Sequence, residues 1–542
     1  MGKKKDAQMD LLSADSATSS SSRAARSSKV NAQSMAARQR EISVSEFFSR
    51  NRHLLGFDNP RRSLLTGIKE AVDNSLDACE EAGILPDIEV QLTQVADDRY
   101  IMRVCDNGPG IVKSQIPNIF GKLLYGSKFH RLRMSRGQQG IGISAASMYG
   151  QLTTGKATRV ISRTGAKRPA HCYEMQIDTA RNKPQIVREE PCEWDQKQGT
   201  QVEIEMEARY QRGRQSVDEY LRQTALANPH LQLLYTAPDG REELYERSSE
   251  EMPQEAQEIK PHPHGIELGV LMKMLQGTPH RTLQGFLTQE FSRVSVRVAK
   301  DICTRADLKP NGRPKSIARE ESDRLFKAIN ATKLMRPPTD CIVPIGEDLL
   351  TASLQANVQA AFYASTTRPP AVYRGNPFQI EVAVAYGGDI NPEGSVQLMR
   401  FANRVPLLYQ PSACAITRSL IDTDWRNYRI SQSNNALPTG PLVVMVHVAS
   451  VWVPFTSESK DAVAHYDEII KEIRLGVQEC GRKVGEHIGK MRREAEAARK
   501  KDYIAQYIGH IAAALQEITG DGDRKTQNVE KNLQGLLERS RS

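Results

Sequence analysis

The chain has 542 residues, 39% hydrophobic and 26% charged, and this balance excludes a fibrous or wholly disordered protein. The formal charge of +9, from 74 basic and 65 acidic residues, favours a polyanionic partner such as nucleic acid without proving one. At roughly 100 to 200 residues per domain, the length predicts about three or four domains.

The sequence shows little sign of a membrane-spanning segment, a secretory signal or a zinc site. We find no uninterrupted apolar stretch of about 18 residues, and MGKKKDAQMDLL contains no apolar secretory segment. We therefore expect a cytoplasmic protein with no membrane partner. The eight cysteines form no C-x-x-C pair, so no zinc site is predicted and the thiols are expected to be reduced packing residues.

Residues 1–40 are rich in serine, alanine, lysine and arginine. Such a segment buries too little surface to offset its ordering entropy, so we predict a disordered basic tail. Two roles stay open for it, a solubilising extension and a non-specific DNA-holding arm.

Residues 41–255 alternate helical and strand periods, which predicts an α/β domain with helices on one face of a sheet. One helix is expected over 64–83. Strands are expected at 87–95, 100–108, 159–164, 170–178 and 200–207.

After the joint IKPHPHG, residues 256–340 carry helical periods and predict a small helical domain. Strand signals return in 341–505, at 342–350, 378–388, 396–409 and 441–455. This second mixed domain ends in a long helix from about Asp461, whose apolar stripe should pack on its own domain and whose exposed end is a candidate docking site. Residues 506–542 form the C-terminal tail.

Two short motifs point to a small ligand. Glu70 and Asn74 lie four residues apart, so on a helix they project from one face. Asp106 ends a strand and is followed by Gly108 and Gly110, which allow a ligand to approach the backbone closely. Each motif alone is more often a solvated helix face or a β-turn.

A third segment, GKLLYGSKFHRLRMSRGQQGIGISAASMYG, runs from glycines into apolar residues. This pattern is typical of a loop that enters a helix N-terminus, where unpaired N–H groups favour phosphate. The Walker and dinucleotide-binding patterns fail here, because Gly121 to Lys128 reads G-S-K and GQQGIG inverts the required order. The order and joint presence of the three segments carry the prediction of a nucleotide site.

The set E-x-x-x-N, D-x-G-x-G, a glycine-rich lid and the pair Gly199-Thr200 resembles the GHKL ATPases. Within that superfamily, the stretches FFSRNRHLLGFDNPRRSLLTGIKEAVDNSLDACEEAGILPDI, RGQQGIGISAASMYGQLTTGKA and VPFTSESKDAVA look like the family of topoisomerase VI B subunits. The resemblance spans about residues 41–500. It implies an α+β multidomain fold.

The implied domains are a GHKL (Bergerat) ATPase sandwich over 41–255, a helix–two-turns–helix domain over 256–340 and a transducer over 341–505. The transducer would have a ribosomal-protein-like βαβ core and the long C-terminal helix. From the residues alone, only a helical region followed by a mixed one is supported.

The resemblance also assigns roles to site residues. Glu70 would position or deprotonate the water that attacks the γ-phosphate, and Asn74 would hold Mg²⁺. Asp106 would accept a hydrogen bond from the adenine amino group, and Lys460 would reach the γ-phosphate from the second domain. The remaining implied nucleotide contacts are Gly108, Gly110, Ser127, Lys128, Arg136, Gly137, Gln138, Gln139, Gly140, Ile141, Gly142, Ile143 and Thr200.

Two further carboxylates, Asp73 and Asp77, share the helix of Glu70. Their different register assigns them support roles only, although Asp77 could still line the pocket.

The function implied is that of an ATP-hydrolysing subunit that dimerises on ATP, clamps duplex DNA and couples hydrolysis to strand passage. Supercoil relaxation and decatenation would follow, in an A2B2 assembly on the nucleoid. Residues 47–57 would cross to the mate. No tyrosine lies in a recognisable DNA-cleaving motif and no D-x-D cluster is present, so the topoisomerase VI A subunit of that assembly would make the double-strand break.

Three other classes fit less well. A sensor histidine kinase needs a phosphoacceptor histidine on a helix before the ATPase, where this chain has its serine-rich segment. A chaperone or mismatch-repair clamp lacks the GFDNP wording. A DNA-binding scaffold that uses ATP only as a structural ligand would lack the base, and Glu70 is present.

Overall fold

The computed structural model describes residues 32–36, 39, 41–127, 131–137, 140–520 and 522–539. The chain divides into the units Met1–Ile42 and Ser43–Ser542. In the first unit, a five-residue helix, α1 (Ala32–Ala36), lies within the expected tail, most of which is outside the described residues. All that follows concerns the second unit.

An eight-stranded sheet, in the order β5-β4-β3-β6-β2-β1-β7-β8, forms the base of the first region. Its neighbouring strands are antiparallel except for the parallel pair β1–β7. The strands are β1 (Asp87–Ala96), β2 (Arg99–Asp106), β3 (Thr158–Arg163), β4 (Ala170–Asp178), β5 (Lys183–Cys192), β6 (Gly199–Glu207), β7 (Gln232–Thr236) and β8 (Glu242–Tyr245). Alternate residues of β1 and β2 are buried, as expected for a sheet that is covered on one face.

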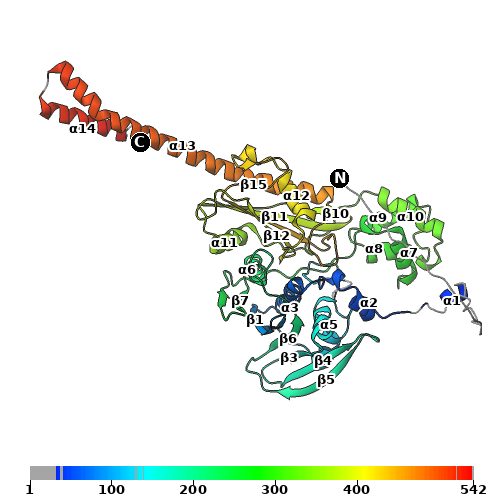
Figure 1. Ribbon diagram of the computed structural model, residues 1–542. Helices are drawn as coiled ribbons and strands as arrows, with labels where there is room; N and C mark the ends of the chain where they lie inside the picture. The colour runs from blue at the N-terminus through cyan, green and yellow to red at the C-terminus, as the bar shows by residue number, and fades with distance from the viewer. Residues whose placement is uncertain are drawn as a thin grey trace, which may run out of the picture. The chain divides into compact units, whose positions relative to one another are not determined.

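Helices α3 and α5 pack side by side on this sheet (Figure 1). The helices of the region are α2 (Val44–Arg50), α3 (Pro60–Glu81), α4 (Ile116–Gly121), α5 (Gly142–Thr154) and α6 (Val217–Ala227), with the 3-10 turns η1 (Arg52–Leu55) and η2 (Lys113–Gln115). Helix α3 begins where the Asn59 side chain accepts a hydrogen bond from the Arg62 N–H and Pro60 takes the first position. Gly67 lets it approach the sheet, because a Cβ there would lie 2.8 Å from the Met102 sulfur.

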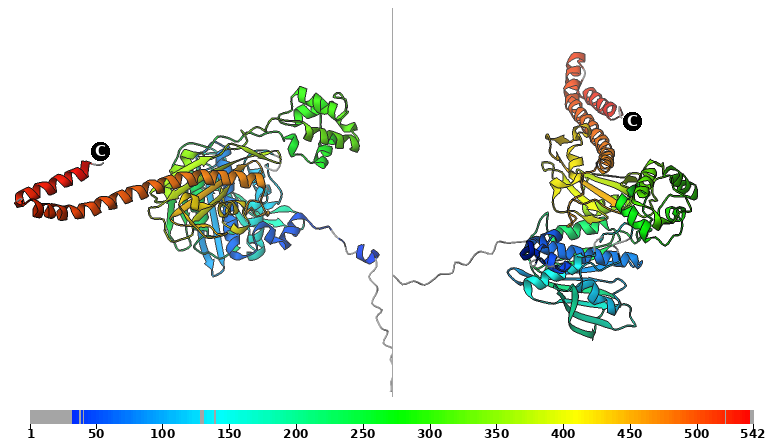
Figure 2. Two further views of the ribbon diagram at one scale, coloured as in Figure 1. Left: turned by 90° about the horizontal axis from the view of Figure 1, so that it is seen from above. Right: turned by 90° about the vertical axis from the view of Figure 1, so that its right-hand side faces the viewer.

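The helices expected between 256 and 340 are present and pack around their own core of Leu271, Phe286, Ile302 and Leu325. They are α7 (Leu268–Gly277), α8 (Leu283–Glu290), α9 (Val296–Arg305) and α10 (Arg319–Ala331), with the turns η3 (Pro263–Gly265) and η4 (Pro314–Ser316). The group is seen in both views of Figure 2.

A six-stranded sheet forms the second region. Its strands are β9 (Phe362–Thr367), β10 (Ala371–Tyr373), β11 (Asn376–Tyr386), β12 (Gln397–Ala402), β13 (Val405–Pro406) and β16 (Leu442–Ser450). Helices α12 (Ala415–Ile421) and α13 (Asp467–Thr519) share a core with one set of its side chains, and α11 (Glu347–Asn357) and α6 share a core with the other. All nine residues of β16 are buried, as expected for a strand that is covered on both faces.

Strands β12 and β16 are parallel and α12 lies between them in the chain, which makes a βαβ unit. The intervening segment also holds a small hairpin of β14 (Ser431–Gln432) and β15 (Pro438–Thr439) and the turns η5 (Pro411–Ala413) and η6 (Trp425–Tyr428).

Helix α13 is longer than the sequence predicts. Ile469, Ile473, Val477, Val484 and Ile488 form the buried stripe on the sheet. The helix then continues to residue 519, so the expected domain boundary at 505 falls within it. In both views of Figure 2, α14 (Asp523–Arg539) folds back beside the distal part of α13, burying Ile508 and Ala512 of α13.

One local prediction needs correction, and several elements were not predicted. The segment 342–350 is not a strand, because Gly346 (φ +95°) precedes a helix that begins at Glu347 and carries acidic residues in its first turn. Among the elements that sequence reasoning missed are β5, β7, β9, α6 and α12. Strand β5 lies at the edge of the sheet and is largely exposed, so it lacks the apolar alternation by which strands are recognised.

Candidate nucleotide site

A cavity of about 600 Å³ lies between α3, the end of β2, the start of α5 and two segments of the second region. This volume suits a small-molecule ligand. Among the predicted site residues, those that line it are Glu70, Asn74, Asp106, Gly110, Ser127, Gly137, Gly140, Ile141, Gly142, Ile143, Thr200 and Lys460. Gly108 and Arg136 do not line it, and Lys128, Gln138 and Gln139 lie outside the described residues.

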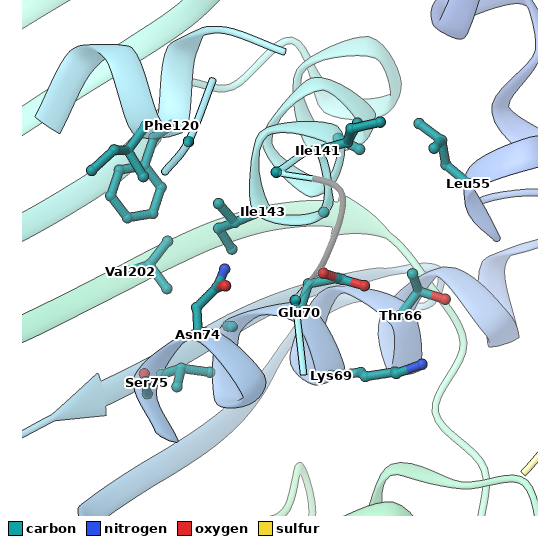
Figure 3. A pocket seen from close by; sticks show the side chains of 18 of the residues that line it. Leu55, Thr66, Lys69, Glu70, Asn74, Ser75, Phe120, Ile141, Ile143 and Val202 are labelled. Atoms are coloured by element: carbon teal, nitrogen blue, oxygen red, sulfur yellow. The ribbon is translucent and has the colours of Figure 1, made fainter. Parts of the chain in front are cut away.

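Glu70 and Asn74 project from α3 on the side that faces Ile141 and Ile143 at the start of α5 (Figure 3). Helix α5 begins at Gly142, whose backbone packs directly on the Glu70 side chain. A Cβ at position 142 would lie 1.7 Å from Glu70 Oε2, so a larger residue there would force the Glu70 side chain out of this position.

The first turn of α5 is suited to an anion. The Ile141 side chain makes no capping hydrogen bond, and the first N–H groups of a helix have no partner within the helix itself. Aligned peptide dipoles add partial positive charge at this end of the helix. The carboxylate of Glu70 therefore lies next to a place that favours phosphate.

Asp106 lies at the end of β2 and is held by three donors. Ser75 Oγ donates to its Oδ2 at 2.8 Å, while the N–H groups of Gly108 and Thr200 donate to its Oδ1 at 3.0 and 3.1 Å. Burial raises the pKa of Asp106, although these hydrogen bonds act to lower it. Gly108 thus supports the carboxylate rather than facing the cavity.

Gly110 allows the chain to turn beside the cavity. Its φ is +70°, and a Cβ there would lie 2.1 Å from the carbonyl oxygen of Arg163. Both the backbone conformation and the close approach require glycine. The motif D-x-G-x-G therefore has one glycine that holds Asp106 and one that shapes the wall.

The Arg136 guanidinium points away from the cavity into a buried ion-pair cluster. It donates to Asp77 Oδ1 at 2.9 Å, to Glu80 Oε1 at 2.6 Å and to Asn228 Oδ1 at 2.5 Å. His230 Nε2 lies 2.8 Å from the same Glu80 oxygen. Burial acts to raise the pKa of Glu80, but Arg136 and His230 hold it well below its usual range. The cluster anchors Arg136, which directly precedes the glycines of the lid before α5, and Asp77 serves this anchor instead of lining the cavity.

Asp73 is also a support residue. It is buried behind the cavity and accepts a hydrogen bond from Tyr220 Oη at 3.0 Å. Burial raises its pKa to about 6.

The second region supplies a separate wall. Lys460 lines the cavity together with Glu458, Ser459 and Asp461, and its Nζ donates to the backbone carbonyl of Arg136 at 3.4 Å. The segment 406–409 lines it as well. Sequence reasoning missed 406–409, because the apolar run PLLY reads as an ordinary strand end.

The N-terminal segment before α3 closes the remaining side. Leu55 and Phe57 line the cavity, and the Phe57 ring stacks on Tyr149 with centroids 5.2 Å apart. Val44 and Phe48 pack against the same core. The segment expected to cross to a mate lies against its own chain in this structure.

The two regions that supply the walls of the cavity each match a family of known proteins. A family model for histidine kinase-, DNA gyrase B- and HSP90-like ATPases matches residues 59–209, and one for the topoisomerase VI B subunit transducer matches residues 337–500. Fold and site therefore define a GHKL-type ATPase joined to a transducer.

Three proteins named as the B subunit of type 2 DNA topoisomerase 6 are similar over most of the chain. That of Methanosarcina barkeri is 48% identical over 488 residues, covering 90% of this chain and 79% of the relative. That of Methanococcoides burtonii is 50% identical over 487 residues (90% and 78%), and that of Archaeoglobus fulgidus is 46% identical over 504 residues (93% and 83%). The chain belongs to the family of type 2 DNA topoisomerase 6 B subunits.

The resemblance and fold class expected from the sequence are thus confirmed, as is the class of function, the ATP-binding subunit of a type IIB DNA topoisomerase. None of the helices within the described residues is long and apolar enough to cross a membrane.

Proposed function

We propose that the cavity binds ATP and hydrolyses it, with Glu70 orienting or deprotonating the attacking water. Phosphoryl transfer depends mainly on an aligned nucleophile and on charge stabilisation. Glu70 beside the N-terminus of α5 supports both, because a carboxylate there faces the place where phosphate is favoured. Asp106 would accept a hydrogen bond from the adenine amino group.

Mg²⁺ would be held by Asn74 together with the phosphates of the nucleotide. Asn74 supplies an amide oxygen in the cavity one turn from Glu70, and Mg²⁺ in nucleotide sites takes few protein oxygens and keeps its other positions for water and phosphate. The bound ion would neutralise phosphate charge, while Glu70 acts on the water.

The observation that carries the proposal is that Lys460 of the transducer lines the same cavity as Glu70. A lysine that contacts the γ-phosphate from another domain distinguishes ATP from ADP. Hydrolysis would then release a contact between domains and allow them to move. In this proposal the ATPase occupies 41–255, the helix–two-turns–helix domain 256–340 and the transducer begins at 341.

The motion would drive strand passage through a double-strand break made by a separate A subunit in an A2B2 assembly, relaxing and decatenating nucleoid DNA in the cytoplasm. The distal part of α13 supports a partner at that end, since it exposes large apolar side chains. These are Tyr503, Ile504, Tyr507, Ile511, Leu515 and Ile518. The formal charge of +9 is consistent with DNA as the substrate.

Sedimentation tests the clamp. We expect a monomer without nucleotide and a dimer with a non-hydrolysable ATP analogue. The Glu70→Ala variant should dimerise with ATP itself, because it binds the nucleotide without consuming it. An unchanged mass in a sample shown to bind the analogue would contradict the clamp.

A further inference from the structure

Arg62 joins three segments at the edge of the nucleotide cavity. It lies in the first turn of α3, and its guanidinium donates to Asp461 Oδ2 of the transducer and to Asp58 Oδ1 at 3.2 Å. Its Cζ also lies 5.1 Å from the ring centroid of Tyr409. The pair with Asp461 is nearly buried, with side-chain exposures of 13% and 8%, whereas Asp58 is 36% exposed. The two ion pairs of Arg62 therefore differ in environment.

Asp461 belongs to the loop that carries Lys460. The loop is closed by a hydrogen bond from the Thr456 N–H to the Ala462 carbonyl at 2.9 Å, and Ser459 Oγ donates to Asp461 Oδ2 at 2.7 Å. Lys460 itself has a φ of +54°. This left-handed conformation is uncommon for a residue with a side chain and persists where the surroundings impose it.

The pair of Arg62 with Asp461 connects the two walls of the cavity, because α3 also carries Glu70. Without the guanidinium, the nearly buried Asp461 carboxylate would lose its ion-pair partner and keep the hydrogen bond from Ser459 Oγ, with the cationic residue Lys460 directly before it in the chain. A buried carboxylate attracts the nearest cation strongly. The lysine would then be drawn to its own neighbour instead of to a phosphate.

We propose that Arg62 is a positioning residue for ATP hydrolysis, whose ion pair with Asp461 holds the transducer loop so that Lys460 reaches the nucleotide. The proposal rests on the function proposed for Lys460. Arg62 does not itself line the cavity. Its effect on hydrolysis should therefore pass through Lys460, while Tyr409 keeps the guanidinium in place.

A double-mutant cycle of Arg62→Gln and Lys460→Ala tests this coupling. We expect Arg62→Gln alone to lower kcat for ATP about tenfold, the scale of one charge-assisted contact, with ADP affinity within about twofold of wild type. In the Lys460→Ala background, Arg62→Gln should cause no further loss. Losses that multiply in the double variant would overturn the proposal.

The same cycle separates this inference from the function on which it rests. Normal hydrolysis in Lys460→Ala alone would show that the lysine has no role in hydrolysis, and it would contradict both proposals. An impaired Lys460→Ala with multiplying losses would leave the lysine in place and end only the role of Arg62.

Two matched controls lie beside Arg62. Arg61→Gln removes an exposed guanidinium from the same turn of α3, and Asp58→Asn removes the exposed partner of Arg62. Both should leave kcat within about twofold of wild type, because surface changes have small effects. A tenfold loss in Asp58→Asn would show that Arg62 acts through Asp58 and not through Asp461, which would contradict the proposal.

Charge exchange keeps the test decisive if Arg62→Gln folds poorly. Arg62→Asp and Asp461→Arg should each lower kcat, and the combined exchange should recover much of the loss if the pair itself matters. A melting temperature near that of wild type establishes that the exchanged protein is folded. No recovery in such a folded protein would contradict the proposal.

Discussion

The two walls of the nucleotide cavity are built in different ways. The first combines α3, the end of β2 and the start of α5, and its carboxylate Asp106 is held by donors from α3, from β6 and from the bend after β2. The second comes from 406–409 and 458–461, which are held by hydrogen bonds within the second region and also contact Arg136 and Arg62 of the first. The first wall can therefore form inside one domain, whereas the second depends on how two domains meet.

This difference assigns separate tasks to the walls. A wall within one domain can hold the base and the adenine in a fixed geometry. A wall that a second domain supplies can form or separate with the state of the nucleotide, so it suits the detection of the γ-phosphate. The predictions below test this division, from the largest expected effect to the smallest.

Glu70→Ala should lower ATP hydrolysis by about two or more powers of ten, because a positioned base contributes a factor on this scale. Nucleotide binding should change little, since the carboxylate acts on the water. Steady-state hydrolysis and binding of a non-hydrolysable analogue check the two parts, with Glu70→Gln as the isosteric variant. Turnover at the wild-type rate would show that Glu70 is not the base for hydrolysis.

Lys460→Ala should lower hydrolysis and, with the A subunit supplied, supercoil relaxation together by about tenfold or more. Adenine binding should persist, because this wall acts on the γ-phosphate. Exposed Lys156 offers a matched control, and Lys156→Ala should stay within about twofold of wild type. Normal hydrolysis and relaxation in Lys460→Ala would show that the second wall does not sense the nucleotide.

Asp106→Asn should weaken the binding of both ADP and ATP about tenfold, since the change removes a charged acceptor and places an amide among three donors. Calorimetry with ADP separates the walls, because Lys460→Ala should leave ADP binding unchanged. An equal loss of ADP affinity in the two variants would contradict the separate tasks of the two walls.

The buried carboxyl group of Asp73 should make the stability of the protein depend on pH. Its folded pKa of about 6 lies above the ordinary value of 3.8, mainly because of burial, so the folded state binds the proton more tightly than the unfolded state. This stabilisation is complete below about pH 4 and is lost as the pH rises through 6.

Asp73→Asn should remove that dependence while keeping an oxygen acceptor for Tyr220. A difference of about two pKa units corresponds to roughly 3 kcal/mol at most. The melting temperature of the variant relative to wild type should therefore be higher at pH 7.5 than at pH 5 by a few degrees. A constant difference at the two pH values would contradict the raised pKa.

The sequence by itself indicated several residues of the first wall, through helical spacing, glycine positions and the order of the three segments. Helical spacing brings Glu70 and Asn74 to one face, and glycines at 110 and 142 mark places where a Cβ does not fit. The family wording also predicted that Lys460 would reach the nucleotide, and the structure brings it to the cavity. Apolar periodicity predicted most strands of both sheets and the buried stripe of α13.

Tertiary structure alone decided how those residues are used. It turned the side chain of Arg136 away from the cavity toward Asp77 and Glu80, and it brought 406–409 into the wall. It also paired Arg62 with Asp461, 399 positions apart in the sequence. Periodicity and spacing report only which side chains share a face of one element. Which charges meet across two elements depends on how elements and domains pack, and no local pattern records that.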